Sequence, residues 1–166
     1  EVTRALEAAR GTQGAITEMR SDMRGGREVS TISPLYWTSR HRLDRISATA
    51  DPIDNSVRNF RVMARRAQSM VRDGEELRPE IIDIIADLSG AYEILREVML
   101  ADPGAQPDEA DAARLLRTIA RKARTDLVVD SSLHATVILA QLRSLLVDLL
   151  MVAGLKRSSA AATLRQ

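Results

Sequence analysis

Four arginines recur at spacings of three, four and three residues in the second half of the chain: Arg114, Arg117, Arg121 and Arg124. On an α-helix this spacing places all four side chains, here called the arginine row, on one face. A guanidinium group offers planar, bidentate donors that match carboxylate and phosphate groups. The row could therefore receive acidic residues of a partner, lipid headgroups or phosphates. The alternative is a solvated face whose arginines pair with Asp or Glu of a neighbouring helix.

A second basic concentration lies beside the two adjacent aromatic residues Tyr36 and Trp37. It consists of Arg40, His41, Arg42 and Arg45. Aromatic and basic residues together are typical of a partner-docking or membrane-proximal end of a helix. A capped core helix with exposed arginines is the alternative. We therefore expect Tyr36 and Trp37 to be further candidates for partner binding.

Residue types suited to nucleophilic catalysis meet at one place, where Asp130, Ser131 and Ser132 precede His134. A catalytic triad is defined by spatial geometry, whereas Asp and Ser directly before an apolar helix are the usual N-cap residues. We expect Asp130 or Ser131 to cap the following helix and His134 to lie beside the cap. The cluster does not indicate an enzyme.

Metal-binding patterns are equally sparse. Asp83 and Asp87 are four residues apart and could share a helix face, but the chain has no Glu-x-x-His pair to complete a di-metal bundle site. His41 and His134 are far apart in sequence. We expect no metal, no cofactor and no catalytic activity.

The composition of the 166-residue chain narrows the class of protein further. The length suits one soluble domain over residues 1–166, and the absence of cysteine excludes disulfides and fits a cytoplasmic setting. A formal net charge of +1 and only 2% aromatic residues disfavour nucleic-acid binding. The chain starts at Glu1 without an initiator methionine or an apolar leader, so we expect a fragment of a longer protein.

One long apolar seam dominates the middle of the chain. Its members alternate at spacings of three and four residues: Leu43, Ile46, Ala50, Ile53, Val57, Phe60, Ala64, Ala67 and Val71. Such a stripe stays on one side of an α-helix. Asp51 and Pro52 interrupt it, either as the start of a new helix or as a kink in one helix. The continuous phase favours one bent helix, capped by Ser33 with Pro34 in its first turn and ending near Gly74.

The other helices follow from similar periodicity and from Pro and Gly at their ends. They are expected at about Val2–Arg24, from Pro79 to just before Asp102, from Pro107 to about Val129 and from Leu133 to about Ala153, with the tail Lys156–Gln166 frayed. The expected inward residues are Ile81, Ile85, Leu88, Tyr92, Leu95 and Met99 in the third long helix and Ala113, Leu116, Ala120, Ala123 and Leu127 in the fourth. The sequence thus predicts an all-α antiparallel bundle of about five helices without strands.

The last long helix is apolar and long enough to cross a bilayer. Gln141, Arg143, Ser144 and Asp148 lie in its middle, and each Arg or Asp at a membrane centre costs about 3 kcal/mol on insertion. We therefore expect the central helix of a bundle, with Arg143 and Asp148 at a seam or paired with other helices. Gly154 should end it in a left-handed conformation.

Two stretches carry a family resemblance. They are Ala-Asp-Pro-Ile-Asp-Asn-Ser-Val-Arg-Asn at 50–59, continued by Ala-Arg-Arg-Ala at 64–67, and Ala-Thr-Val-Ile-Leu-Ala-Gln-Leu-Arg-Ser-Leu-Leu-Val-Asp-Leu-Leu at 135–150 with the following Ala-Gly-Leu. They resemble the C-terminal cytoplasmic region of actinobacterial FUSC-type membrane proteins, the fusaric acid resistance or aromatic acid exporter-like family. The resemblance implies a membrane domain before Glu1 and a position on the cytoplasmic side of the inner membrane. It assigns no substrate-pathway residue here.

Three functions are compatible with these observations. The first is a cytoplasmic interaction or regulatory domain that docks a soluble partner, such as a cell-envelope or division component, or a second copy of itself through a helix face. The second is an accessory domain of an exporter of small aromatic or organic acids, with the arginine row guiding anions. The third is a small all-α enzyme with an arginine-lined cavity. We favour the first.

Overall fold

The computed structural model of the chain describes residues 37–100 and 109–165, with side chains from Ser47 onward except that of Glu109. Of the first 36 residues it describes only positions 4, 7, 8, 10–12, 14, 15, 17, 18, 21 and 22, all of them helical. The helices are α2 (Trp37–Arg72), α3 (Pro79–Leu100), α4 (Glu109–Lys122), the 3₁₀ helix η2 (Thr125–Val128), α5 (Leu133–Val152) and α6 (Arg157–Thr163).

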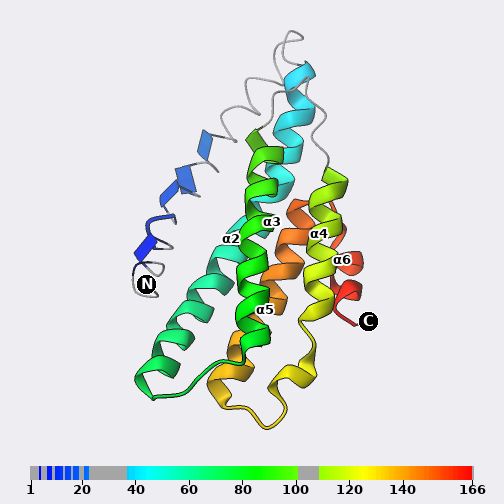
Figure 1. Cartoon of the computed structure of the whole chain (residues 1–166). Helices are drawn as coiled ribbons and strands as arrows, with labels where there is room; N and C mark the ends of the chain where they lie inside the picture. The colour runs from blue at the N-terminus through cyan, green and yellow to red at the C-terminus, as the bar shows by residue number, and fades with distance from the viewer. Residues whose placement is uncertain are drawn as a thin grey trace.

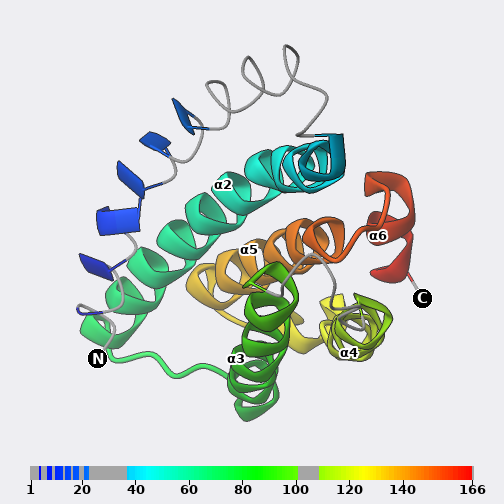
Figure 2. The ribbon, with the colours of Figure 1, turned by 90° about the horizontal axis from the view of Figure 1, so that it is seen from above.

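Successive long helices run in opposite directions from α2 to α5 (Figure 1). Seen from above, α5 occupies the middle of the bundle, with α2 on one side and α3 and α4 on the other (Figure 2). No strand occurs in the part of the chain that the structure describes. The predicted all-α antiparallel bundle is confirmed.

Helix α5 is apolar on most of its surface because other helices surround it. Its fully buried side chains include Ile138, Leu142, Leu146 and Leu150. The helix begins at a Ser132 cap, whose hydroxyl accepts a hydrogen bond from the amide of Ala135. The predicted cap was Asp130 or Ser131, so the cap lies closer to the helix than expected; Asp130 instead has a positive φ of 59° in the preceding turn.

The C-terminal ends of α2 and α5 use the same glycine motif. Gly74 and Gly154 have φ values of 72° and 87°, a left-handed conformation that glycine adopts without a steric penalty. The amides of Gly154 and Leu155 donate to the carbonyls of Met151 and Leu150, which forms a Schellman motif. The two helix ends predicted at these glycines are confirmed.

Helix α2 continues through Pro52, which is buried inside it. Figure 1 shows the helix changing direction within its cyan part. Its start is described from Trp37 onward, so the expected cap at Ser33 and Pro34 lies outside the described residues. The prediction of one helix rather than two across Pro52 is confirmed.

The predicted seam of α2 holds in its middle and fails at its C-terminal end. Ala50 and Ala64 are buried and Phe60 is half-buried against the core, but Val71 is 71% exposed while Met70 is 3% exposed. A three-four alternation averages 3.5 residues per turn, whereas an α-helix has 3.6, so the stripe drifts around the helix by about 20° per heptad. The drift moves Val71 off the buried face. The side chains of Leu43 and Ile46 lie outside the described set.

The buried line of α3 differs from the predicted one. Ile81, Leu88 and Leu95 are buried as expected, but Tyr92 is 59% exposed, whereas Ile85 and Met99 are only half-buried. Their places in the core are taken by Ile84, Ala91 and Val98. The reason is that α3 packs mainly on α4 rather than facing α2, which rotates its core-facing side.

Helix α4 is shorter than predicted. Ala113, Leu116, Ala120 and Ala123 are buried as expected and Leu127 is half-buried, but the α-helix ends at Lys122 instead of near Val129. Arg124 adopts an extended backbone with ψ 150°, and the carbonyl of Ala123 accepts a hydrogen bond from the Arg143 side chain of α5. This contact takes the place of a further helical turn. The predicted start at Pro107 lies outside the described residues.

The tail is not frayed, contrary to the prediction. It contains helix α6, whose Ala160 is fully buried. Leu155 and Leu164 pack against the core on either side of it. The carbonyl of Leu164 also accepts a hydrogen bond from Arg143, at 2.9 Å. Small alanines let α6 approach α5 closely, and periodicity in so short a segment was too weak to predict the helix.

Candidate functional site

Helix α4 carries an apolar face against the bundle and a cationic face toward solvent. Its buried side chains recur at helical spacing and are Ala112, Ala113, Leu116, Ile119 and Ala120. Arg114, Arg117 and Arg121 lie on the opposite face, and all three are exposed. The structure therefore brings these three arginines together on one side of α4, as the spacing predicts.

The arginines of the row make only local contacts in the part of the chain that the structure describes. Arg114 Nη1 lies 2.6 Å from Asp111 Oδ1 one turn earlier, and Arg121 donates to the Thr118 hydroxyl at 3.3 Å. Arg117 has no carboxylate within ion-pair distance among the described residues. The contact with a neighbouring helix is made by a lysine instead, since Lys122 Nζ lies 2.7 Å from Asp87 Oδ2 of α3.

Arg124 departs from the predicted arrangement. It lies beyond the end of α4, so it does not share the helical register of the other three arginines. Its guanidinium makes two hydrogen bonds to the carboxylate of Asp126. These bonds hold the pKa of Asp126 below its usual value and raise the pKa of Arg124. Both side chains are exposed, so this ion pair adds little to stability.

The second candidate region cannot be compared with the structure. Tyr36 lies outside the described residues. Trp37 is the first residue of α2, but its side chain lies outside the described set. The same holds for the side chains of Arg40, His41 and Arg42.

The Asp-Ser-Ser-x-His cluster forms a helix start rather than a catalytic triad. The hydroxyl of Ser132 accepts the amide of Ala135, and His134 Nε2 lies 3.0 Å from Asp73 Oδ2 at the end of α2. His134 Nδ1 is buried without a hydrogen-bond partner. His134 thus connects the end of α2 to the start of α5, and its ring nitrogen is directed to Asp73 rather than to a serine.

Carboxylates do not gather into a metal site in the described part of the chain. Asp87 pairs with Lys122, and no group of three or more His, Asp or Glu side chains close enough to hold an ion occurs among the described residues. Asp83, Asp87 and His134, whose side chains the structure describes, belong to no such group.

Helix α5 keeps its two charged side chains inside the bundle. By length and composition Leu133–Val152 could cross a membrane, but half of its apolar window is buried within the bundle. Arg143 donates to the carbonyls of Ala123 and Leu164, and Asp148 Oδ2 accepts from Asn59 Nδ2 at 2.7 Å. Burial raises the pKa of Asp148, although Asn59 and the charge of Arg157 oppose that rise. The sequence left two placements open, at a seam or paired with other helices. The structure pairs Asp148 with α2 and bonds Arg143 to the chain after α4 and to the C-cap of α6.

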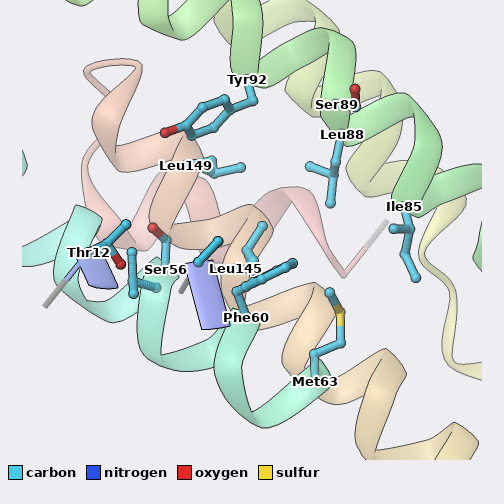
Figure 3. Close-up of a pocket in the computed structure, with 12 residues that line it drawn as sticks. Thr12, Ser56, Phe60, Met63, Ile85, Leu88, Ser89, Tyr92, Leu145 and Leu149 are labelled. Carbon is cyan, nitrogen blue, oxygen red and sulfur yellow. The ribbon is translucent and has the colours of Figure 1, made fainter. Parts of the chain in front are cut away.

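Sequence reasoning missed an apolar pocket between the helices. Its cavity volume is about 530 Å³, and its walls come from α2, α3, α5 and two described residues of the N-terminal segment, Ala8 and Thr12. Figure 3 shows Tyr92 and Leu88 on one side of it and Phe60 and Met63 on the other. The sequence signal that could have indicated this pocket is Tyr92, an aromatic residue in an otherwise aliphatic stripe.

The fold and these surfaces define the class of protein: an all-α bundle with a cationic outer face and an apolar internal pocket. Among known proteins, no family model and no solved structure matches the chain. It is 35% identical over 171 aligned positions to an uncharacterized protein of Corynebacterium glutamicum. The alignment covers 99% of this chain but only 43% of that relative, so the chain spans less than half of the relative's length.

Proposed function

We propose that the chain is a docking domain on the cytoplasmic side of the inner membrane, part of a FUSC-type membrane protein, whose arginine row binds an acidic surface of a soluble cytoplasmic partner. The resemblance at residues 50–59 and 135–150 supports the membrane setting. The relative's length beyond the aligned region leaves room for a membrane domain in that protein.

One observation carries the docking proposal: the row faces solvent and is not neutralised by another helix within the described part of the chain. Arg114 and Arg124 have carboxylates beside them from their own segment, Asp111 and Asp126. Arg117 and Arg121 lie between these pairs without a carboxylate within ion-pair distance among the described residues. The centre of the row therefore presents two guanidinium groups that a partner's carboxylates can bind in bidentate fashion.

The same row disfavours docking of a second copy through this face. Two identical cationic rows brought together would place like charges opposite one another. Such a juxtaposition costs about 3 kcal/mol. An acidic partner gains from the same charges through steering and specificity. Self-association would therefore need a different surface of the bundle.

The test reverses the two central charges and compares them with a matched pair elsewhere. Arg117→Glu/Arg121→Glu alters the row, and Arg65→Glu/Arg96→Glu makes the same change in net charge at exposed positions of α2 and α3. Each protein is immobilised and used to capture partners from a cytoplasmic extract, with a polyglutamate peptide as competitor. Thermal midpoints are measured for all three proteins.

The expected result is that wild type and the control pair capture the same partner, and that polyglutamate and added salt release it. The row variant should lose at least about tenfold in affinity, since an arginine anchor contributes about 2 kcal/mol at an interface. Its midpoint should stay close to that of the control, because exposed charges contribute little to folding. Equal capture by both double variants would refute the role of the row.

The exporter alternative rests on the same arginines acting as an anion guide. It differs in its ligand, since a small aromatic carboxylate would then bind near the row. Titration with benzoate, followed by amide chemical shifts of α4, separates the two. Shifts at Arg117 and Arg121 that saturate would favour the exporter role over protein docking.

The enzyme alternative requires an arginine directed into a cavity. Arg143 does line a second cavity of about 380 Å³, together with Thr125, Thr136 and Ser144. Its guanidinium, however, donates to the carbonyls of Ala123 and Leu164 and ties α5 to the chain after α4 and to the C-terminal end of α6. These bonds support a structural role for Arg143 rather than substrate binding.

A further inference from the structure

The apolar pocket exists because α2 and α3 diverge over the surface of α5. Helix α2 packs along α5, whereas α3 packs chiefly on α4 and touches α5 much less. Leu145 and Leu149 of α5 lie at the base of the space between them. Figure 3 shows the side chains of α2 and α3 on opposite sides of this space. The pocket is therefore a feature of the helix arrangement and not a defect left by one small side chain.

The described residues that line the pocket are uncharged. Each helix contributes a stripe at helical spacing: Ser56, Val57, Phe60 and Met63 from α2, Ile85, Leu88, Ser89 and Tyr92 from α3, and Leu145 and Leu149 from α5. Among the described residues that line it, none carries a carboxylate, ammonium, guanidinium or imidazole group. The hydroxyl of Ser56 already donates to the carbonyl of Ile53 at 2.7 Å, so it can only accept from a ligand. Ser89 and Tyr92 are exposed and add hydroxyls at the rim.

We propose that this pocket binds one uncharged, predominantly apolar small molecule, such as a neutral aromatic compound. Its volume of about 530 Å³ falls within the range of roughly 300–1,000 Å³ typical of small-molecule sites, which occur between helices of bundles. An ionised ligand would lose its hydration without gaining a countercharge in the lining, which is strongly unfavourable. This site is separate from the arginine row, and its ligand class excludes the organic anions that the row would attract.

The dimensions argue against a helical peptide as the occupant. A helix with its side chains has a diameter of about 10 Å and rises about 5.4 Å per turn, so the pocket volume corresponds to roughly one turn. A docked helix needs several turns of contact to be stable. The pocket is also bounded on its fourth side by Ala8 and Thr12 of the chain itself.

The test uses two probes that share their rings and differ in charge. N-phenylnaphthylamine is neutral, anilinonaphthalene sulfonate carries a sulfonate, and both fluoresce more strongly in apolar surroundings. The full chain should bind the neutral probe saturably at one site, and the sulfonate should displace it at least about tenfold less effectively because the lining holds no cation. Absence of saturable binding, or equal displacement by the sulfonate, would overturn the proposal.

A pair of matched substitutions tests whether the neutral probe binds in the pocket. Val57 and Val62 are both half-buried on α2, but only Val57 lines the pocket. Val57→Phe should fill the space and weaken binding of the neutral probe about tenfold or more, whereas Val62→Phe should leave it within about twofold. Equal effects of the two substitutions would show that the probe binds elsewhere.

The methionine methyl signals of the wild-type chain test the same binding site without any substitution that could disturb folding. Met63 and Met70 are buried on the same helix, at 5% and 3% exposure, but only Met63 lines the pocket. In the spectrum of methyl-labelled methionines, the neutral probe should shift the Met63 signal and leave that of Met70 in place. Unshifted Met63, with saturable fluorescence, would refute the assignment of the pocket as the binding site.

Discussion

Arg143 is the side chain whose removal tests the packing of the bundle most directly. Its guanidinium donates to the carbonyl of Ala123, just after α4, and to that of Leu164, at the C-cap of α6. A cation beside these helix ends also meets the negative ends of the helix dipoles. Arg143→Met keeps an apolar stem along α5 and removes both hydrogen bonds. Arg143→Lys keeps the charge but cannot span two carbonyls with a planar fork.

The expected loss follows from these two bonds. A hydrogen bond from a charged group contributes about 1.5–3 kcal/mol, and an acceptor left unsatisfied when buried costs a similar amount. Arg143 is half-buried, so water replaces part of what is lost. We therefore expect Arg143→Met to lower the free energy of unfolding by about 2–4 kcal/mol and Arg143→Lys by about half as much.

Urea unfolding followed by far-UV circular dichroism measures both losses. Arg165→Met is the matched control, because Arg165 is an exposed arginine next to the same end of α6 and should change stability by less than about 0.5 kcal/mol. Hydrogen exchange should also accelerate in α6 more than in α2 when Arg143 is replaced. A loss below about 0.5 kcal/mol for Arg143→Met would mean that water satisfies the two carbonyls and that the bonds do not hold α6.

Three further predictions concern the carboxyl of Asp148, the apolar core and the glycine that ends α5. Asp148→Asn should stabilise the fold at neutral pH, because burial raises the pKa of Asp148 and the folded state therefore binds its proton more tightly than the unfolded chain does. The free energy of unfolding of the wild type should fall as pH rises from about 3.8 through that raised pKa. Urea midpoints measured across this pH range should show the fall in the wild type and not in Asp148→Asn. Leu146→Ala should lower the free energy of unfolding in urea by about 3–5 kcal/mol. Phe60→Ala should lower it by less, about 2–3 kcal/mol, because the half-buried ring already borders a cavity. Equal losses for the two variants would contradict the position of the pocket. Gly154→Ala should lower the thermal midpoint by an amount equivalent to about 1 kcal/mol because φ there is 87°, and an unchanged midpoint would contradict the left-handed turn.

Periodicity and helix-end residues predicted most of the architecture. The helix boundaries at Gly74, Pro79 and Gly154 depend on local backbone preferences, and the structure places them where the sequence indicates. The continuation of α2 through Pro52 could also be predicted from local sequence, because the apolar stripe keeps the same helical phase on both sides of the proline. Local chemistry therefore sufficed wherever the neighbouring residues in sequence decide the conformation.

The errors occur where a distant element decides. Helix α4 ends early because Arg143 takes the carbonyl of Ala123, a contact between residues twenty positions apart. Tyr92 is exposed because the buried face of α3 packs against α4. The apolar stripe of a helix does not by itself indicate which neighbouring helix it will contact. The pocket escaped prediction for the same reason, since it depends on the separation of two helices. For the row, spacing predicted the face of Arg114, Arg117 and Arg121 but not the extended backbone at Arg124.

The extensive packing of α2 against α5 has a consequence for how the chain folds. Asn59 and Asp148, which join the two helices, are 89 residues apart in sequence, and α3 and α4 lie between them in the chain. Pairing of distant segments requires closure of a long loop, which slows folding relative to bundles built from adjacent hairpins. During synthesis α2 leaves the ribosome before its main packing partner, α5, has been made. Its apolar stripe therefore stays exposed to solvent while α3 and α4 form. Substitutions that increase the apolar surface of α2 should therefore reduce the yield of folded protein more than equivalent substitutions in α5.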